Sequence, residues 1–159
     1  MVAVCFVCLG NICRSPTAEG VFLHLLAERG WTDRVRVDSA GTAGYHVGHR
    51  PDPRSLAAAA RRGIELPSRA RRFEAEDLAR FDLVLAMDAE NLADLRAMAR
   101  DEAEAARVRL FREFDPASGE GAEVPDPYYG GEDGFETVLD LCFAAAEGLL
   151  DELGPRLAP

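Results

Sequence analysis

Apolar runs alternate along this chain with segments whose apolar residues recur about every 3.6 positions. Short apolar runs bounded by turn residues are typical of buried parallel strands, and the 3.6-residue period is typical of the helices that cover them. The pattern predicts strands at about 2–8, 34–39, 82–87 and 107–110, and helices at about 16–29, 53–62, 89–105 and 135–153. This alternation indicates an α/β fold with a parallel sheet.

The segment 115–134 breaks the alternation, because its eight prolines and glycines oppose regular structure. A loop of this length is usually functional or disordered. The helix predicted after it has one apolar face, formed by Val138, Leu139, Cys142, Ala146, Leu149 and Leu153. The first helix has a similar face, formed by Ala18, Phe22, Leu25 and Leu26. We therefore expect both helices to pack on the sheet.

The first strand and the first helix are joined by the sequence Cys8-Leu9-Gly10-Asn11-Ile12-Cys13-Arg14-Ser15-Pro16. A strand-to-helix turn points its amide groups inward as an anion-binding nest, and the helix N-terminus adds partial positive charge. Gly10 and Asn11 tolerate backbone angles that other residues avoid. Arg14 offers a planar fork of donors that matches two phosphate oxygens. The sequence therefore predicts a phosphate-binding loop over residues 9–15.

Cys8 is the predicted nucleophile of this loop. Helix N-termini and nearby cations lower the pKa of a thiol to roughly 3.5–7.5, so we predict a thiolate at neutral pH. Its attack on phosphorus would give a phosphocysteine that water hydrolyses, while Arg14 and the amides hold the phosphate oxygens. Ser15 is the predicted N-cap of the helix, with Pro16 at the first helical position. The hydroxyl of Ser15 is also expected to reach the sulfur.

This nonapeptide closely resembles the signature of the low-molecular-weight protein tyrosine phosphatases. Three further motifs follow in the order that the family has them: Val37-Asp38-Ser39-Ala40-Gly41-Thr42, Phe81-Asp82-Leu83-Val84-Leu85-Ala86-Met87-Asp88 and Asp126-Pro127-Tyr128-Tyr129-Gly130. The resemblance spans nearly the whole chain. It implies a three-layer α/β/α fold with a four-stranded parallel sheet in the order 2-1-3-4. The length fits a single domain over residues 1–159.

The resemblance also implies the activity. A member of this family would hydrolyse phosphotyrosine in proteins, and small aryl phosphates, through a phosphocysteine intermediate. Its partners would be phosphotyrosine proteins, with a cognate tyrosine kinase as a further candidate, and its product would be inorganic phosphate. We expect no cofactor and no metal, because His46 and His49 have no acidic or thiol partner nearby in the sequence.

Asp126 is the candidate general acid, because a phenolate leaves poorly without a proton. Asp115-Pro116 offers a second Asp-Pro pair, and such pairs usually initiate turns. Asp126 is preferred because the residues after it match the donor loop of the family. An aryl group also needs apolar walls, and Ile12, Tyr45, Tyr128 and Tyr129 are the candidates by matching position. For any single tyrosine, packing in the core is the alternative.

The remaining cysteines divide into core and redox candidates. Cys5 and Cys8 have an odd offset on one strand and should point to opposite faces, which makes Cys5 a buried core residue. Cys142 lies on the apolar face of the last helix. Cys13 resembles the second cysteine of the family, which implies a reversible disulfide with Cys8 that protects the nucleophile from over-oxidation. The alternative is that Cys13 merely fills the loop.

The resemblance also implies how the loop is braced. The side chains concerned are Asn11, Ser15 and Ser39. A histidine of the family is replaced here by Ser68. This departure puts part of the bracing network in doubt.

Charge is distributed unevenly over a net −10. Residues 1–73 hold 11 arginines and 6 acidic residues, a net +5, and residues 74–159 hold 7 arginines and 22 acidic residues, a net −15. We expect the arginines near the loop to frame its mouth and steer anionic ligands. They are Arg50, Arg54, Arg69, Arg71 and Arg72. The alternative is a scattered, solvated surface.

The composition excludes several classes of function. The net negative charge and the lack of interleaved basic and aromatic residues oppose nucleic-acid binding. No apolar run approaches the ~20 residues of a membrane span. A reactive thiolate requires a reducing compartment, so we expect a cytoplasmic protein.

Three alternative functions remain open. An arsenate reductase on the same scaffold needs two further cysteines after the third strand, and no cysteine lies between Cys13 and Cys142. Protein-arginine phosphatases resemble this chain but carry Thr in place of Ile12. A non-catalytic phosphotyrosine-binding module would not need both Cys8 and Asp126.

Overall fold

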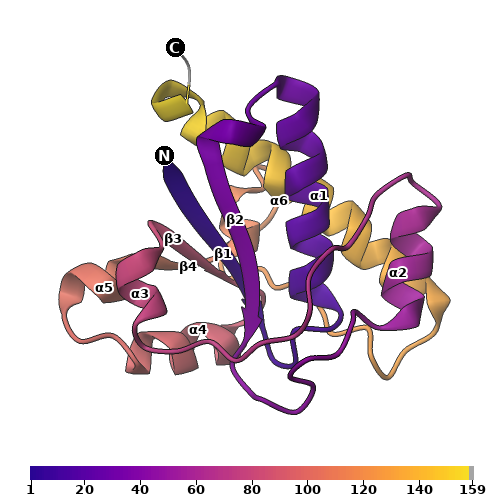
Figure 1. The fold of residues 1–159 in the computed structure, drawn as a ribbon, viewed down its shortest axis with the longest axis horizontal. Helices are drawn as coiled ribbons and strands as arrows, with labels where there is room; N and C mark the ends of the chain where they lie inside the picture. The colour runs from indigo at the N-terminus through magenta and orange to yellow at the C-terminus, as the bar shows by residue number, and fades with distance from the viewer. Residues whose placement is uncertain (158–159) are drawn as a thin grey trace.

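Four parallel strands form the centre of the computed structural model, which describes residues 1–157. Their order is β2-β1-β3-β4, as expected (Figure 1). The strands are β1 (Val2–Cys8), β2 (Val35–Gly41), β3 (Leu83–Ala86) and β4 (Val108–Leu110). All run in the same direction, so their carboxyl ends meet at one edge of the sheet, where such folds bind ligands. Cys8, the last residue of the central strand β1, pairs with Gly41 there.

Helices cover both faces of this sheet, which confirms the three-layer α/β/α architecture (Figure 1). One layer holds α1 (Arg14–Arg29), α2 (Pro53–Ala60) and α6 (Glu132–Leu157). The other holds the shorter helices α3 (Asp77–Arg80), α4 (Ala89–Ala97) and α5 (Glu102–Ala106). Two short 3-10 helices, Thr32–Arg34 and Phe111–Phe114, lead into β2 and out of β4.

Strand β1 is buried along its whole length because both of its faces are covered. Phe6 packs edge-on against Phe22 of α1 and Phe111, with ring centroids 5.5 and 5.0 Å apart. Cys5 and Cys8 belong to the two hydrophobic clusters on opposite faces of the sheet, as their odd offset predicts. The apolar faces predicted for the first and last helices are buried in the cluster that contains Phe6.

Helix α3 has no predicted counterpart, and the helices predicted over 89–105 and 135–153 differ most from the structure. The single helix expected over 89–105 is wrong, because Asp101 accepts a hydrogen bond from the Glu104 amide and starts a new helix after α4 has ended. Helix α6 begins at Glu132, three residues before the predicted start, and runs on to Leu157 past Pro155. Its first residues are Glu132 and Asp133, and acidic side chains stabilise a helix N-terminus.

Over residues 1–157, no helix combines the length and the apolar character needed to span a bilayer.

Candidate active site

The loop between β1 and α1 leaves its amide groups without partners in the protein. Over the described residues, no N–H from Leu9 to Arg14 donates to a backbone carbonyl. The carbonyls of the same loop are occupied: those of Cys8, Leu9 and Ile12 accept from the amides of Thr42, Ala43 and Asp52 at 2.8–3.0 Å. Buried backbone amides are almost always paired. A loop whose carbonyls are bound and whose amides are not is therefore built for an anion.

Asn11 holds this loop in shape from behind. Its φ of 57° lies in the left-handed region, which asparagine tolerates better than most residues. Its side-chain nitrogen donates to the hydroxyls of Ser15 and Ser39 at 2.7 and 3.0 Å, and its oxygen accepts from the amide of Arg71 at 3.1 Å. The Asn11 side chain is buried and so contacts the underside of the loop rather than a ligand.

Ser15 fulfils only one of its two predicted roles, the approach of its hydroxyl to the Cys8 sulfur. The expectation that it caps the helix is wrong, because α1 already begins at Arg14 and its N-cap is Cys13, which makes no side-chain cap. The Ser15 hydroxyl instead accepts from Asn11 and lies 3.1 Å from the Cys8 sulfur. A hydroxyl at this distance can donate a hydrogen bond to a thiolate and stabilise its charge.

Arg14 is fixed beside Cys8 by a residue that the sequence did not identify as part of the site. Its guanidinium donates to Asp88 at 2.6 Å and to the carbonyl of Val124 at 3.2 Å. Burial lowers the pKa of Arg14, but the charges of Cys8 and of the two aspartates beside the guanidinium outweigh it and the pKa is raised. Asp88 also caps α4 by accepting a hydrogen bond from the amide of Asn91 at 2.8 Å.

Asp126 reaches the same cavity from the segment before α6. Its Oδ2 lies 3.6 Å from Arg14, and its Oδ1 accepts from the amide of Tyr128 at 3.0 Å. The Asp126 side chain remains 39% exposed. Asp115, the alternative aspartate, accepts from the amide of Ala117 and belongs to a turn. Of the two Asp-Pro pairs, the structure therefore brings only Asp126 to the loop.

A cavity of about 320 Å³ opens above the phosphate loop. All four candidate pocket residues line it, namely Ile12, Tyr45, Tyr128 and Tyr129. Cys8, Leu9, Gly10, Cys13, Arg14, His46 and Asp126 complete the lining. The Tyr45 and Tyr129 side chains are 74% and 93% exposed, so they form the rim, whereas Ile12 is half-buried at the base. The cavity thus has an anion site at the bottom and aromatic rings at the mouth.

Glu19 is a buried carboxyl behind the loop that sequence reasoning missed. It is 5% exposed and accepts a hydrogen bond from Ser39 at 2.7 Å, which links it through Ser39 to Asn11. Burial raises the pKa of Glu19, and hydrogen bonds from Ser39 and Ser68 oppose that shift only in part. The sequence did indicate that Glu19 is buried, because it lies next to Ala18 and three positions before Phe22 on the apolar face of the first helix.

Cys13 and Cys8 are separate thiols in this structure. Burial, followed by the charge of Asp52, raises the pKa of Cys13 to about 12, and the nearby hydroxyl of Ser55 opposes this shift. Cys13 is therefore protonated at neutral pH. Cys5 and Cys142 are buried in the core, as expected.

The five arginines expected at the mouth do not act as one group. Arg71 forms ion pairs at 3.0 Å with both Asp38 and Asp77, so the expectation that it steers ligands is not supported by its contacts. Arg54 is paired with Asp52 but also donates to the carbonyl of Tyr128 at 3.0 Å, which places it at the edge of the mouth. Over the described residues, Arg14 is the only arginine that lines the cavity.

Known proteins are similar to this chain in sequence and in fold. The family model of the low molecular weight phosphotyrosine protein phosphatases matches residues 3–157. A relative from Streptomyces coelicolor, named low molecular weight protein-tyrosine-phosphatase, is 51% identical over 148 residues, which cover 92% of this chain and 90% of the relative.

Solved structures of phosphatases have the same fold as this chain. The crystal structure of a protein tyrosine phosphatase from Entamoeba histolytica matches with a TM-score of 0.93 and 36% identity, covering 98% of this chain and 99% of that one. The Drosophila arginine phosphatase matches with a TM-score of 0.86 and 32% identity, covering 94% and 96%. On the strength of the family model and the close relative, the chain belongs to the low molecular weight phosphotyrosine protein phosphatase family.

Proposed function

We propose that this protein hydrolyses phosphotyrosine in proteins, and small aryl phosphates, through a phosphocysteine intermediate. The observation that carries the proposal is the loop around Cys8, whose carbonyls are bound while its amides have no backbone acceptor. A phosphate dianion satisfies these amides and places phosphorus next to the sulfur. Membership of a phosphatase family and the named relatives support the same reaction.

The first step is attack of the Cys8 thiolate on phosphorus. The phosphorus–oxygen bond to the tyrosine breaks as the sulfur–phosphorus bond forms, and the phenol oxygen leaves. Arg14 holds two of the remaining oxygens through its planar fork, and Asp88 keeps that fork in place. Removing one such preorganised donor typically slows a reaction by about 10²–10³-fold.

Asp126 serves as the general acid in this step. Its carboxyl gives a proton to the leaving phenol oxygen and later accepts one from the water that attacks the phosphocysteine, which releases inorganic phosphate and restores the thiolate. Its side chain is partly exposed and lines the cavity, so it can reach a leaving group held above Cys8. Protonation of the leaving group contributes roughly 10²–10⁴-fold.

The shape of the cavity supports selection of an aryl substrate. Tyr45, Tyr128 and His46 surround the mouth, and the rings of His46 and Tyr128 have their centroids 6.5 Å apart. A phenyl ring that enters the mouth can contact these side chains in offset or edge-on geometry. We therefore expect phosphoserine, whose side chain is shorter and lacks a ring, to be a poor substrate.

Phosphoarginine is the second candidate substrate, because one matching structure is named an arginine phosphatase. The arginine phosphatases carry Thr at the position of Ile12, and the Ile12 side chain here is apolar and half-buried. An apolar residue offers no hydrogen-bond acceptor to a guanidinium, which favours phosphotyrosine. A direct comparison of phosphotyrosine and phosphoarginine peptides with the same flanking residues separates the two.

Reversible oxidation is a further part of the proposal. Peroxide converts the Cys8 thiolate to a sulfenic acid, and the Cys13 thiol condenses with it to form a disulfide and water. Dithiothreitol then restores both thiols. After peroxide treatment, the Cys13→Ser variant should regain less activity on addition of dithiothreitol than the wild type does. Full recovery of activity in this variant would contradict the disulfide. In the cell, the return of the disulfide to two thiols requires a reducing compartment. We therefore propose that the protein is cytoplasmic.

The decisive experiment compares leaving groups. Asp126→Ala should lower kcat/KM for phenyl phosphate by about 10²-fold or more and lower kcat/KM for p-nitrophenyl phosphate much less, because a good leaving group needs little protonation. The comparison uses kcat/KM because hydrolysis of the phosphocysteine, which Asp126 also assists, is common to both substrates. Cys8→Ser should abolish turnover of both. An equal loss for both substrates in Asp126→Ala would refute its role as acid, and turnover by Cys8→Ser would refute the phosphocysteine.

The cellular partners can be found with the same variants. Cys8→Ser should retain phosphoproteins that the wild type releases, since the phosphate loop remains intact while the nucleophile is gone. Mass spectrometry of the retained proteins names the substrates and shows whether a tyrosine kinase is among them.

A further inference from the structure

The mouth of the cavity has two walls of opposite charge. The basic wall consists of residues 39–51 and 66–73, which contain no Asp or Glu but carry His46, His49, Arg50, Arg69 and Arg72. The acidic wall is the segment 123–133, which contains no basic residue but carries Glu123, Asp126, Glu132 and Asp133. Both walls line the same cavity, through Tyr45 and His46 on one side and Tyr128 and Tyr129 on the other.

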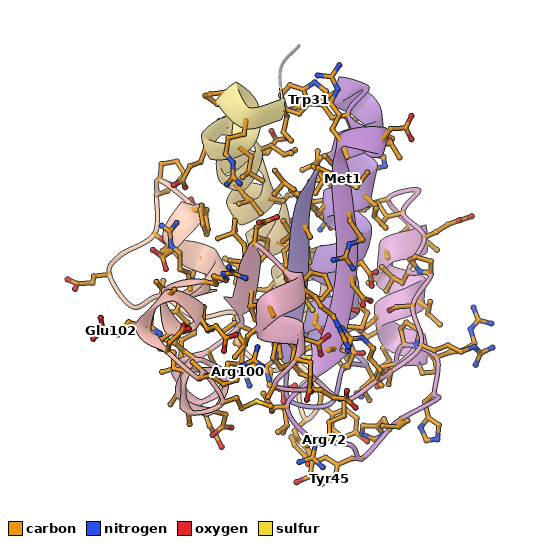
Figure 2. The ribbon with its side chains drawn as sticks, turned by 60° about the vertical axis from the view of Figure 1, so that its left-hand side comes forward. Met1, Trp31, Tyr45, Arg72, Arg100 and Glu102 are labelled. Carbon is orange, nitrogen blue, oxygen red and sulfur yellow. The ribbon has the colours of Figure 1, made fainter. Side chains whose placement is uncertain are left out.

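The two segments of the basic wall are tied together by their backbones. The Gly41 amide donates to the carbonyl of Arg71, the Gly48 amide to that of Ala70, and the Ala70 amide to that of His49, each at 2.8 Å. Figure 2 shows Tyr45 and Arg72 beside each other at the end of the molecule far from Met1 and Trp31. A methyl group built on Gly44 would lie 3.7 Å from Cδ of Arg72. Arg72 is therefore held next to the rim residue Tyr45.

Three arginines of this wall lack an acidic partner. Arg50, Arg69 and Arg72 are exposed, and over residues 1–157 none of them forms an ion pair within 4.0 Å. The neighbouring Arg54 and Arg71 are, by contrast, paired with aspartates at 3.0 Å. The chain has 28 acidic residues that could have neutralised this surface. Its positive charge is thus available to a ligand that approaches the cavity.

Building on the proposed phosphatase activity, we propose that the basic wall selects phosphotyrosine sites flanked by acidic residues, with Arg72 as a specificity-determining residue. An extended peptide spans about 3.3–3.6 Å per residue, so residues within three positions of the phosphotyrosine pass over the rim. Carboxylates there are attracted by Arg72 and its neighbours and repelled by Glu132 and Asp133. This fixes both the preferred sequence and the side of the cavity on which the acidic flank lies.

The test uses three phosphotyrosine peptides of equal length whose flanks carry acidic, alanine or arginine residues. For the wild type, kcat/KM should fall in that order, by about tenfold overall at low salt, the size of one or two exposed ion pairs. Arg72→Glu should bring the acidic-to-basic ratio to about one or below. The matched control is Arg156→Glu, which should keep the wild-type ratio. Arg156 is exposed and lies near Met1 and Arg34, away from the cavity. Circular dichroism and thermal unfolding establish that each variant is folded.

Binding of the same peptides to Cys8→Ser separates this proposal from the proposed function. If the wild type fails to hydrolyse p-nitrophenyl phosphate, the phosphatase assignment falls, whereas the same ranking of peptides in binding to Cys8→Ser still supports the basic wall. A wild-type ratio near one overturns the proposal, as does an unchanged ratio in Arg72→Glu. A drop of equal size in Arg72→Glu and Arg156→Glu also overturns it, because it reveals a general attraction of anions to the protein.

Discussion

The phosphate loop and the segment that bears Asp126 serve one cavity but are built differently. The loop of residues 8–15 is short, and Asn11, Ser15 and Ser39 hold it from behind by buried hydrogen bonds. The segment 115–131 is long and largely exposed. Near Asp126, hydrogen bonds connect this segment to the rest of the protein. For example, the amide of Val124 donates to the carbonyl of Met87 at 2.7 Å, and the guanidinium of Arg54 donates to the carbonyl of Tyr128.

This difference matches what each part has to do. Charge stabilisation is effective only when donors are already in place before the reaction, so the loop must be rigid. A proton donor must let the substrate in and the product out, and exposed segments with few contacts open more easily. The two regions should therefore respond differently to substitution.

The largest effect is expected for Arg14→Lys. Lysine has no planar fork, so it cannot bind two phosphate oxygens and Asp88 at the same time. We therefore expect kcat/KM to fall by about 10²–10³-fold. The loss should be similar for phenyl phosphate and p-nitrophenyl phosphate in steady-state assays, because the phosphate group is the same. Dependence on the leaving group, like that expected of Asp126→Ala, would contradict the separation of roles.

The next effect concerns packing. A methyl group on Gly41 would lie 2.7 Å from the Leu9 carbonyl oxygen and 3.2 Å from the Asn11 amide, so Gly41→Ala should cost about 1–3 kcal/mol and distort the loop. Gly130→Ala, beside Asp126, meets only the Pro127 carbonyl at 3.6 Å and should change stability by less than about 0.5 kcal/mol. Urea unfolding of both variants measures the difference. Equal losses would show that the two regions are equally rigid.

A smaller effect is expected from the buried carboxyl behind the loop. The pKa of Glu19 is raised in the folded protein, so its contribution to stability is full below its usual pKa and is lost as the pH rises through the folded value. Glu19→Gln stays neutral, and from pH 5 to pH 7.5 it should therefore gain stability relative to the wild type, on the order of 1 kcal/mol. Urea unfolding across this range provides the measurement. A difference that shrinks with rising pH would mean that the fold favours the charged form.

The smallest effect is expected for Tyr129→Ala. This side chain is 93% exposed, so stability should change by less than about 0.5 kcal/mol. Tyr128→Ala should be more harmful, because Tyr128 is less exposed, packs near His46 and lies under the guanidinium of Arg54 at 5.4 Å. Comparison of KM for phenyl phosphate in the two variants shows which ring contacts the substrate. A larger rise in KM for Tyr129→Ala would reverse this order.

Local sequence was sufficient for the phosphate loop and for most of the elements around it. The proposed nucleophile Cys8, Arg14 and the flexible positions lie within eight consecutive residues, so their arrangement depends mainly on one strand, one turn and one helix. Strand β1 has the predicted bounds, because the apolar run that ends just before Gly10 is the length of a strand and too short for a buried helix. Helix boundaries were less accurate at Ser15, because its hydroxyl bonds to Asn11 and approaches the sulfur instead of capping the helix.

Tertiary structure decided the contacts between residues that are far apart in the chain. Asp88 meets Arg14 across 74 positions because β3 lies next to β1 and both strands end at the same edge of the sheet. Glu19 became a buried partner of Ser39 only through the packing of α1 on β2, and Asp126, unlike Asp115, reached the cavity only through the path of a long loop. Sequence periodicity shows which side chains are buried, but it contains no information on which distant groups share a site, because the pairing of strands and the course of loops set those distances.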